Sequence, residues 1–375
     1  MDNRFVIYIL VFLWFSSSCN SSVEYDGAAL SHFDISNASN KKSSDLEIVE
    51  LVPLETTSEN LMGMEFRVRI NEDGFWVMNE DTKDAVHHFS LDGSYLGNNV
   101  VIGEGPNTLG NMFDFYPNPD GTLSVLSSIG QFSTIYSINK AGVTEKILEF
   151  EYPSSAFTKL NSENYLVYGG YNLPVITHRV IEVGNNNLTG RKFLENTYKN
   201  QMITMTERNF FKSTDELFVI ESFDNIVKKY SNGNMISYLF VDFGKYNIPS
   251  KFWELDIMEG FEMINENGFA SFHGVFADNE NLLLSVFHQS REGVFKKLLF
   301  LNKPYDKGYS IEIRRDENNP FYQPIGIRDD RVLFITYRSI LINYLKEKEE
   351  SSTFLAKIPQ NDFDYPVIVF SKTNF

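Results

Sequence analysis

One pattern recurs along this chain and limits the folds that it can adopt. In each copy, a turn rich in Asn, Asp and Gly leads into a short apolar strand, and a polar gap and a second strand with aromatic residues usually follow. The six turns lie at residues 71–74, 118–121, 161–164, 213–215, 278–281 and 328–330. They recur about every 45 to 65 residues, which is the size of a four-stranded propeller blade. We therefore predict an all-β fold, a six-bladed β-propeller with four-stranded antiparallel blades.

A pair of β-sandwiches would show similar turn spacing and is the alternative fold. Six copies over one continuous stretch exceed what two sandwiches require, so the propeller is favoured. Residues 46–54 and 367–371 resemble strands, and we predict that both termini join one blade and so remove free edges. The propeller domain is expected over residues 46–375. Short helices are expected in insertions at residues 252–263 and 340–350.

The N-terminus resembles a secretion signal that ends at a cysteine. Arg4 precedes an apolar run over residues 5–15, and three serines stand before Cys19, the one cysteine of the chain. The run is too short for a membrane-spanning helix. We predict a lipoprotein signal peptide over residues 1–18, lipidation of Cys19, and a flexible Ser- and Asn-rich tether over residues 19–45. Ser16 stands where a lipobox has Leu, and an ordinary secretory signal is the alternative.

Charge and cysteine content exclude two classes of function. The formal net charge is -17, whereas a nucleic-acid partner requires a concentrated positive surface. Lipidation of Cys19 would leave no thiol for catalysis and no disulfide, so the fold would depend on its core. Adjacent His87 and His88 point to opposite faces of a strand, which argues against a shared metal site.

A glycine loop at residues 103–110 looks at first like a phosphate-binding loop. It has no lysine, and a strand-like segment follows it where a nucleotide fold would have a helix. We interpret the loop as the crossing from the first blade to the second, after a fourth strand at residues 94–102. Gly103 and Gly105 are expected to adopt positive φ angles there.

Four segments carry a family resemblance. VELVPLETT (49–57), DAVHHFSLDGSYLG (84–97), GEGP (103–106) and YPVIVF (365–370) resemble the six-bladed β-propeller lipoproteins of Bacteroidetes, which have NHL- or TolB-like blades. The resemblance implies a lipid anchor in the outer membrane, on its periplasmic or cell-surface side, and no assigned activity. Asn107 and Thr108 replace the Gly-Glu that the family usually has after this loop.

Polar residues four or five places ahead of the turns should lie near the mouth of the central channel, because the innermost strands begin there. These residues are Arg67, Asp114, Arg208, His273 and Gln323. Their mixed charge, with one carboxylate, suits a polar ligand better than the six to eight oxygens of a calcium site.

No catalytic group can be assigned from spacing, so a non-enzymatic role is favoured. We predict a cell-envelope lipoprotein that acts as a binding or scaffold propeller for a protein partner or a small polar ligand, such as a glycan or peptide. Its expected partners are the membrane, through the lipid, and an envelope protein or glycan, but no nucleic acid and no cofactor. The alternative is a calcium-dependent, lactonase-like hydrolase or lyase that uses the central channel, and a purely structural lipoprotein is a third possibility.

Overall fold

The computed structural model describes residues 30–171, 175–184, 190–198, 208–213, 216–315, 317–348 and 352–372. The predicted signal peptide, Cys19 and the first part of the predicted tether lie outside these ranges. Within the described residues, no helix is both long and apolar enough to cross a membrane.

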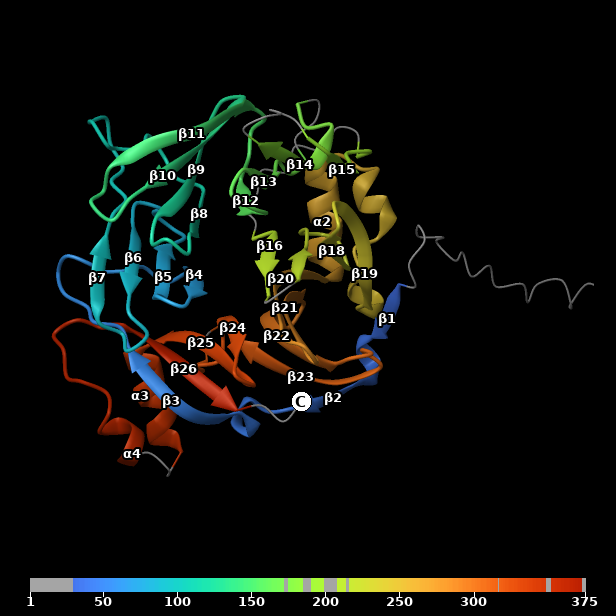
Figure 1. Cartoon of the computed structure of the whole chain (residues 1–375). Helices are drawn as coiled ribbons and strands as arrows, with labels where there is room; N and C mark the ends of the chain where they lie inside the picture. The colour runs from blue at the N-terminus through green and yellow to red at the C-terminus, as the bar shows by residue number, and fades with distance from the viewer. Residues whose placement is uncertain are drawn as a thin grey trace, which may run out of the picture.

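Six antiparallel sheets stand around a common axis as the blades of a propeller, which confirms the predicted fold (Figure 1). Each blade has four antiparallel strands, which run in order from the axis outward. Blade 1 holds β4 (Phe66–Asn71), β5 (Gly74–Asn79), β6 (Val86–Phe89) and β7 (Tyr95–Asn98). Blade 2 holds β8 (Asp114–Pro117), β9 (Leu123–Ile129), β10 (Phe132–Ile138) and β11 (Thr144–Glu151). Blade 3 holds β12 (Ala156–Lys159), β13 (Asn164–Tyr168), β14 (His178–Gly184) and β15 (Lys192–Glu195).

The other three blades follow in chain order. Blade 4 holds β16 (Phe210–Lys212), β17 (Leu217–Val219), β18 (Ile226–Ser231) and β19 (Asn234–Asp242). Blade 5 holds β20 (Phe269–Ala277), β21 (Asn281–Ser290), β22 (Gly293–Asn302) and β23 (Lys307–Arg314). Blade 6 holds β24 (Pro324–Arg328), β25 (Arg331–Tyr337), β26 (Pro366–Lys372) and, outermost, β3 (Glu47–Pro53).

The recurring turns join the first and second strands of the blades, and their side chains explain the repeat. In blade 1, the Asn71 side-chain oxygen accepts from the backbone N–H groups of Asp73, at 3.0 Å, and Gly74, at 3.2 Å. Asn161 and Asp278 make the same pair of bonds in blades 3 and 5. Such Asx turns satisfy backbone donors that a tight reversal leaves unpaired.

The two termini share one blade, as predicted. β26 from the C-terminus pairs with β3 from the N-terminus in antiparallel register, with Val369 opposite Leu51. Because the two segments lie at opposite ends of the sequence, this pairing closes the ring.

The predicted tether is wrong for residues 30–45, which form part of the fold. β1 (Ser31–Asp34) adds a fifth strand parallel to β19, and β2 (Ala38–Lys41) adds one parallel to β23. The 3-10 turns η1 (Ile35–Asn37) and η2 (Ser43–Asp45) connect them to β3. Phe33 is 1% exposed in a core that includes Leu239 and Val241. The segment looks polar because its other side chains lie at the rim, where at least one side of a strand faces solvent.

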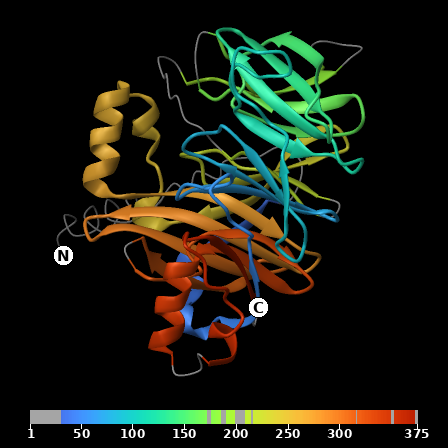
Figure 2. The same ribbon diagram turned by 90° about the vertical axis from the view of Figure 1, so that its left-hand side faces the viewer.

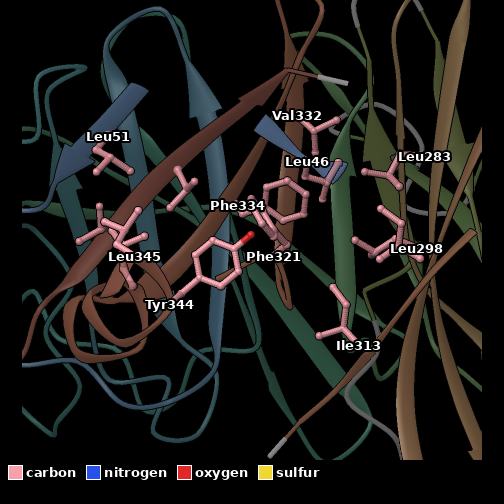
Figure 3. Close-up of a cluster of buried hydrophobic side chains, with 14 of the residues drawn as sticks. Leu46, Leu51, Leu283, Leu298, Ile313, Phe321, Val332, Phe334, Tyr344 and Leu345 are labelled. Carbon is pink, nitrogen blue, oxygen red and sulfur yellow. The ribbon is translucent and has the colours of Figure 1, made fainter. Parts of the chain in front are cut away.

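Two insertions carry the helices, close to the predicted positions. Between blades 4 and 5, η3 (Gly244–Tyr246) and η4 (Ser250–Trp253) precede α2 (Ile257–Asn267), which stands out from the blades (Figure 2). In blade 6, α3 (Arg338–Glu347) and α4 (Ser352–Leu355) follow β25. Tyr344 and Leu345 of α3 pack with Phe321 and Phe334 into the apolar core that blades 5 and 6 share (Figure 3).

Candidate functional site at the propeller axis

The structure brings the five predicted site residues to one end of the propeller axis. Arg67 and Asp114 lie at the starts of the innermost strands β4 and β8, while Arg208 and Gln323 lie just before β16 and β24. His273 lies within β20, at a bulge between Phe272 and Gly274. Five of the six blades therefore contribute a polar side chain to the same region. We call this region, together with the neighbouring Arg69, Glu80 and Lys296, the axial cluster.

Glu80 links two blades on opposite sides of the ring. Its Oε1 accepts from Arg67 Nε at 2.7 Å and from Arg208 Nε at 2.9 Å. Arg208 Nη2 and Gln323 Nε2 both donate to the carbonyl oxygen of Phe66, each at 2.5 Å. Blades 1, 4 and 6 are thus joined by charged and amide side chains across the axis.

Asp114 holds the second carboxylate of the cluster and is fully buried. Arg67 Nη1 lies 2.8 Å from it and Arg69 Nη2 lies 3.1 Å from it. The Phe157 backbone N–H, from blade 3, donates to its other oxygen at 3.0 Å. Burial alone would raise the pKa of Asp114, but the Arg69 and Arg67 guanidiniums outweigh burial and hold this pKa below its usual value. Both carboxylate oxygens of Asp114 therefore already have partners within the protein.

On the side of blades 5 and 6, the cluster contains a cation with no counter-ion among the described residues. Lys296 of β22 is 4% exposed, and its Nζ lies 4.2 Å from the centre of the Tyr322 ring. Burial, reinforced by the charge of Arg208, lowers the pKa of Lys296 to about 7. The charge of Lys296, together with burial, lowers the pKa of His273 well below its usual value, so His273 is neutral at pH 7.

Sequence reasoning missed Arg69, Glu80 and Lys296. Glu80 follows the second strand of its blade and Lys296 lies on the third, so a rule based on the innermost strands could not find them. One signal was present, because Lys296 and Lys297 interrupt the otherwise apolar strand VFKKLLFLN. Their two side chains must point to opposite faces of the sheet, and both faces of a strand inside a blade are largely buried.

The residues at the axis do not fit a calcium ion. Glu80 and Asp114 are the carboxylates of the cluster, and arginines occupy both. Among the described residues, no group of three or more His, Cys, Asp or Glu side chains is placed to hold a metal. His87 and His88 have different neighbours, since His87 lies 3.3 Å from the Tyr95 hydroxyl whereas His88 stacks on Trp76 with ring centres 3.7 Å apart.

The glycine loop joins blades 1 and 2, but its conformation differs from the prediction. The positive φ lies at Asn107, at 60°, and neither Gly103 nor Gly105 adopts one. Asparagine tolerates this region better than most residues. The Thr108 hydroxyl lies 2.9 Å from the Gly103 carbonyl oxygen and accepts from the Gly105 N–H at 2.8 Å. Asn107 and Thr108, which depart from the family pattern, therefore determine the conformation of this loop. The fourth strand of blade 1 is also shorter than predicted, at Tyr95–Asn98.

A second buried ion network lies between blades 3 and 4. Arg179 Nε and Nη2 donate to Glu221 at 2.5 and 3.1 Å, and Lys228 Nζ lies 3.0 Å from the same carboxylate. Lys228 also pairs with Asp224. All the charges in this network have partners, so we regard it as structural. At the opposite end of the same two blades, a hollow of about 530 Å³ is lined by charged and polar residues, among them Lys159, Glu182, Arg191, Lys212, Glu216 and Tyr230.

The fold and the axial cluster define a six-bladed β-propeller with a charged centre. A family model described as a domain of unknown function (DUF4934) matches residues 30–372, and the chain belongs to this family. No curated protein matches the chain.

A solved structure from Bacteroides fragilis shows a similar fold. A "Putative exported protein" from Bacteroides fragilis has a TM-score of 0.73 at 14% identity, covering 92% of this chain and 100% of the other. A streptogramin B lyase has a TM-score of 0.43 at 12% identity, covering 78% and 96%. Virginiamycin B lyase from Staphylococcus aureus has a TM-score of 0.40 at 11% identity, covering 76% and 94%. Likeness at the level of the two lyases says nothing about the activity of this chain.

Proposed function

We propose that this protein is an exported, lipid-anchored binding propeller whose axial cluster receives a small polar ligand, such as a glycan or peptide group. The observation that carries the proposal is the convergence of polar side chains from five of the six blades at one end of the axis. The apolar cores of a propeller lie between its blades, and burying charge at the axis is costly unless hydrogen bonds or a partner charge offset it. A rigid ring is a suitable scaffold for such a site, because the strands fix each side chain.

The envelope location is part of the same proposal. It rests on the resemblance of residues 1–19 to a lipoprotein signal, on the resemblance of further segments to the propeller lipoproteins of Bacteroidetes, and on the likeness to the "Putative exported protein" of Bacteroides fragilis. Labelling cells with a radioactive or clickable fatty acid tests the anchor. Label on the wild type and none on Cys19→Ser supports it, while equal labelling contradicts it. Protease treatment of intact cells then separates the two faces of the outer membrane.

Ligand binding is tested by thermal denaturation of the purified protein against panels of glycans and peptides. A ligand that binds the native state raises the Tm, and the stabilisation grows with the logarithm of its concentration over Kd. The matched variant is Arg208→Met, which removes the blade 4 contribution to the axis. The proposal fails if no ligand stabilises the wild type, or if Arg208→Met responds as the wild type does. We do not favour the calcium-dependent hydrolase or lyase, because arginines already occupy the axial carboxylates.

A further inference from the structure

The axial cluster carries more positive than negative charge, although the whole protein is strongly acidic. Arg67, Arg69, Arg208 and Lys296 face two carboxylates, Glu80 and Asp114. The three arginines share these carboxylates among themselves. The other acid close to Lys296 is Glu65, which is half exposed and pairs with Arg315 at 3.1 Å.

Lys296 is the residue that this imbalance leaves without an anion. Its ammonium makes no hydrogen bond or ion pair with any residue that the structure describes, and its polar contact is the face of the Tyr322 ring. A cation over an aromatic ring gains about 0.5–2 kcal/mol, which does not offset the several kcal/mol that burial of an ion costs. A lysine selected for stability alone would have a carboxylate beside it, as Lys228 has two.

The neighbours of Lys296 can also bind an oxyanion. Arg208 uses Nε on Glu80 and Nη2 on the Phe66 carbonyl, which leaves further N–H donors on its guanidinium. His273 is neutral and offers a ring N–H as well. His273, Tyr322 and Gln323 are only partly buried, so the cluster is not sealed from solvent.

Resting on the proposed binding function, we propose that the ligand of the axial cluster is an oxyanion, a carboxylate or phosphate group, which binds the Lys296 ammonium between His273 and Arg208. The bound anion supplies the counter-charge that the protein lacks. Burial and neighbouring cations destabilise the charged form of Lys296, and a bound anion would favour that form and raise its pKa again. Acidic sugars, peptide carboxyl ends and phosphorylated compounds share this chemistry.

The test compares two adjacent lysines. In Lys296→Met the axial cation is removed, and in Lys297→Met the same charge is lost from the opposite face of β22, where Lys297 lies 3.5 Å from Glu312. Thermal denaturation and calorimetric titration are carried out with inorganic phosphate, glucuronate and glucose, at constant ionic strength. We expect phosphate or glucuronate, but not glucose, to raise the Tm of the wild type and to give a saturable binding curve in the calorimetric titration. Lys297→Met should respond like the wild type, and Lys296→Met should bind the anion at least tenfold more weakly.

The Tm without ligand separates a binding role from a structural one. Because Lys296 is a buried cation without a counter-ion among the described residues, Lys296→Met should be as stable as the wild type or more stable. The inference is overturned if Lys296→Met is markedly less stable, if it binds the anion as well as the wild type does, or if no anion binds the wild type. Should neutral glycans or peptides bind while anions do not, this inference fails and the proposed binding function stands. If nothing binds, both fail.

Discussion

Glu221→Gln tests whether the ion network between blades 3 and 4 stabilises the fold. Glu221 is 1% exposed and meets Arg179 at 2.5 Å and Lys228 at 3.0 Å. The amide keeps the shape of the side chain but leaves the two buried cations with one carboxylate, Asp224, between them. Removing one partner of a buried ion pair costs about 3–5 kcal/mol. We expect the free energy of unfolding at pH 7 to fall by about that amount.

The pH dependence of stability gives a second estimate of what Glu221 contributes to the free energy of unfolding. Burial would raise the pKa of Glu221, but Lys228 and Arg179 outweigh burial and lower this pKa from 4.5 to about 2. A carboxyl group whose pKa is lower in the native state stabilises that state fully above its unfolded pKa, and the stabilisation is lost as the pH falls. A shift of this size corresponds to about 3 kcal/mol. The stability gap between the wild type and Glu221→Gln should therefore close between pH 4.5 and pH 2.

Urea denaturation at a series of pH values measures both effects, with tryptophan emission as the probe. Trp253 stacks on Tyr198 with ring centres 4.0 Å apart, close to Arg179. The control is Glu149→Gln, which removes the exposed ion pair with Lys146 and should cost under about 1 kcal/mol. A loss below about 1 kcal/mol for Glu221→Gln at pH 7, or a gap that stays constant down to pH 2, would refute the reasoning.

Three further changes test the fold by chemical denaturation. Phe33→Ala should lower the free energy of unfolding by about 3–5 kcal/mol, because the Phe33 side chain of β1 is buried in the core. Phe132→Ala, at a side chain 53% exposed, should lower it by under about 0.5 kcal/mol. Equal losses would contradict the role of the N-terminal strands. Gly74→Ala should cost at least about 2 kcal/mol, since its Cβ would lie 1.9 Å from the Phe89 carbonyl oxygen, and a neutral result would contradict that close approach. Asn107→Ala should cost about 1 kcal/mol and Asn107→Gly much less, because Ala tolerates the positive φ poorly; equal stability of the two variants would argue against that conformation.

The blades could be predicted because each one repeats the same local chemistry. Asn71, Asn161 and Asp278 close equivalent turns with equivalent hydrogen bonds, and such bonds leave a periodic mark on the sequence. Five of the axial residues could also be predicted, because the position of the innermost strands follows from the strand order once the blades are counted. Their convergence was expected, but the ligand that they bind remains a proposal.

The parts that were missed depend on contacts between distant segments. β1 looks like a tether because one side chain, Phe33, accounts for most of its burial, and its partner β19 lies far along the chain. Lys296 was missed because its position depends on how the third strand of blade 5 meets the loop that carries Tyr322. The conformation of Asn107 was assigned to the glycines because glycine is the usual residue at positive φ, yet asparagine also tolerates it.

The positions of β1, β2 and β3 in the sequence limit when these strands can pair with their partners. β1, β2 and β3 leave the ribosome first, but Phe33 pairs opposite Val241, and Leu51 pairs opposite Val369. The partner of β1 comes about two thirds of the way along the chain, and the partners of β2 and β3 come later still. Ring closure therefore requires a chain that extends through β26, and distant pairing of this kind slows folding. A truncated chain that ends before β26 would leave β3 without a neighbour and expose it to pairing with other chains.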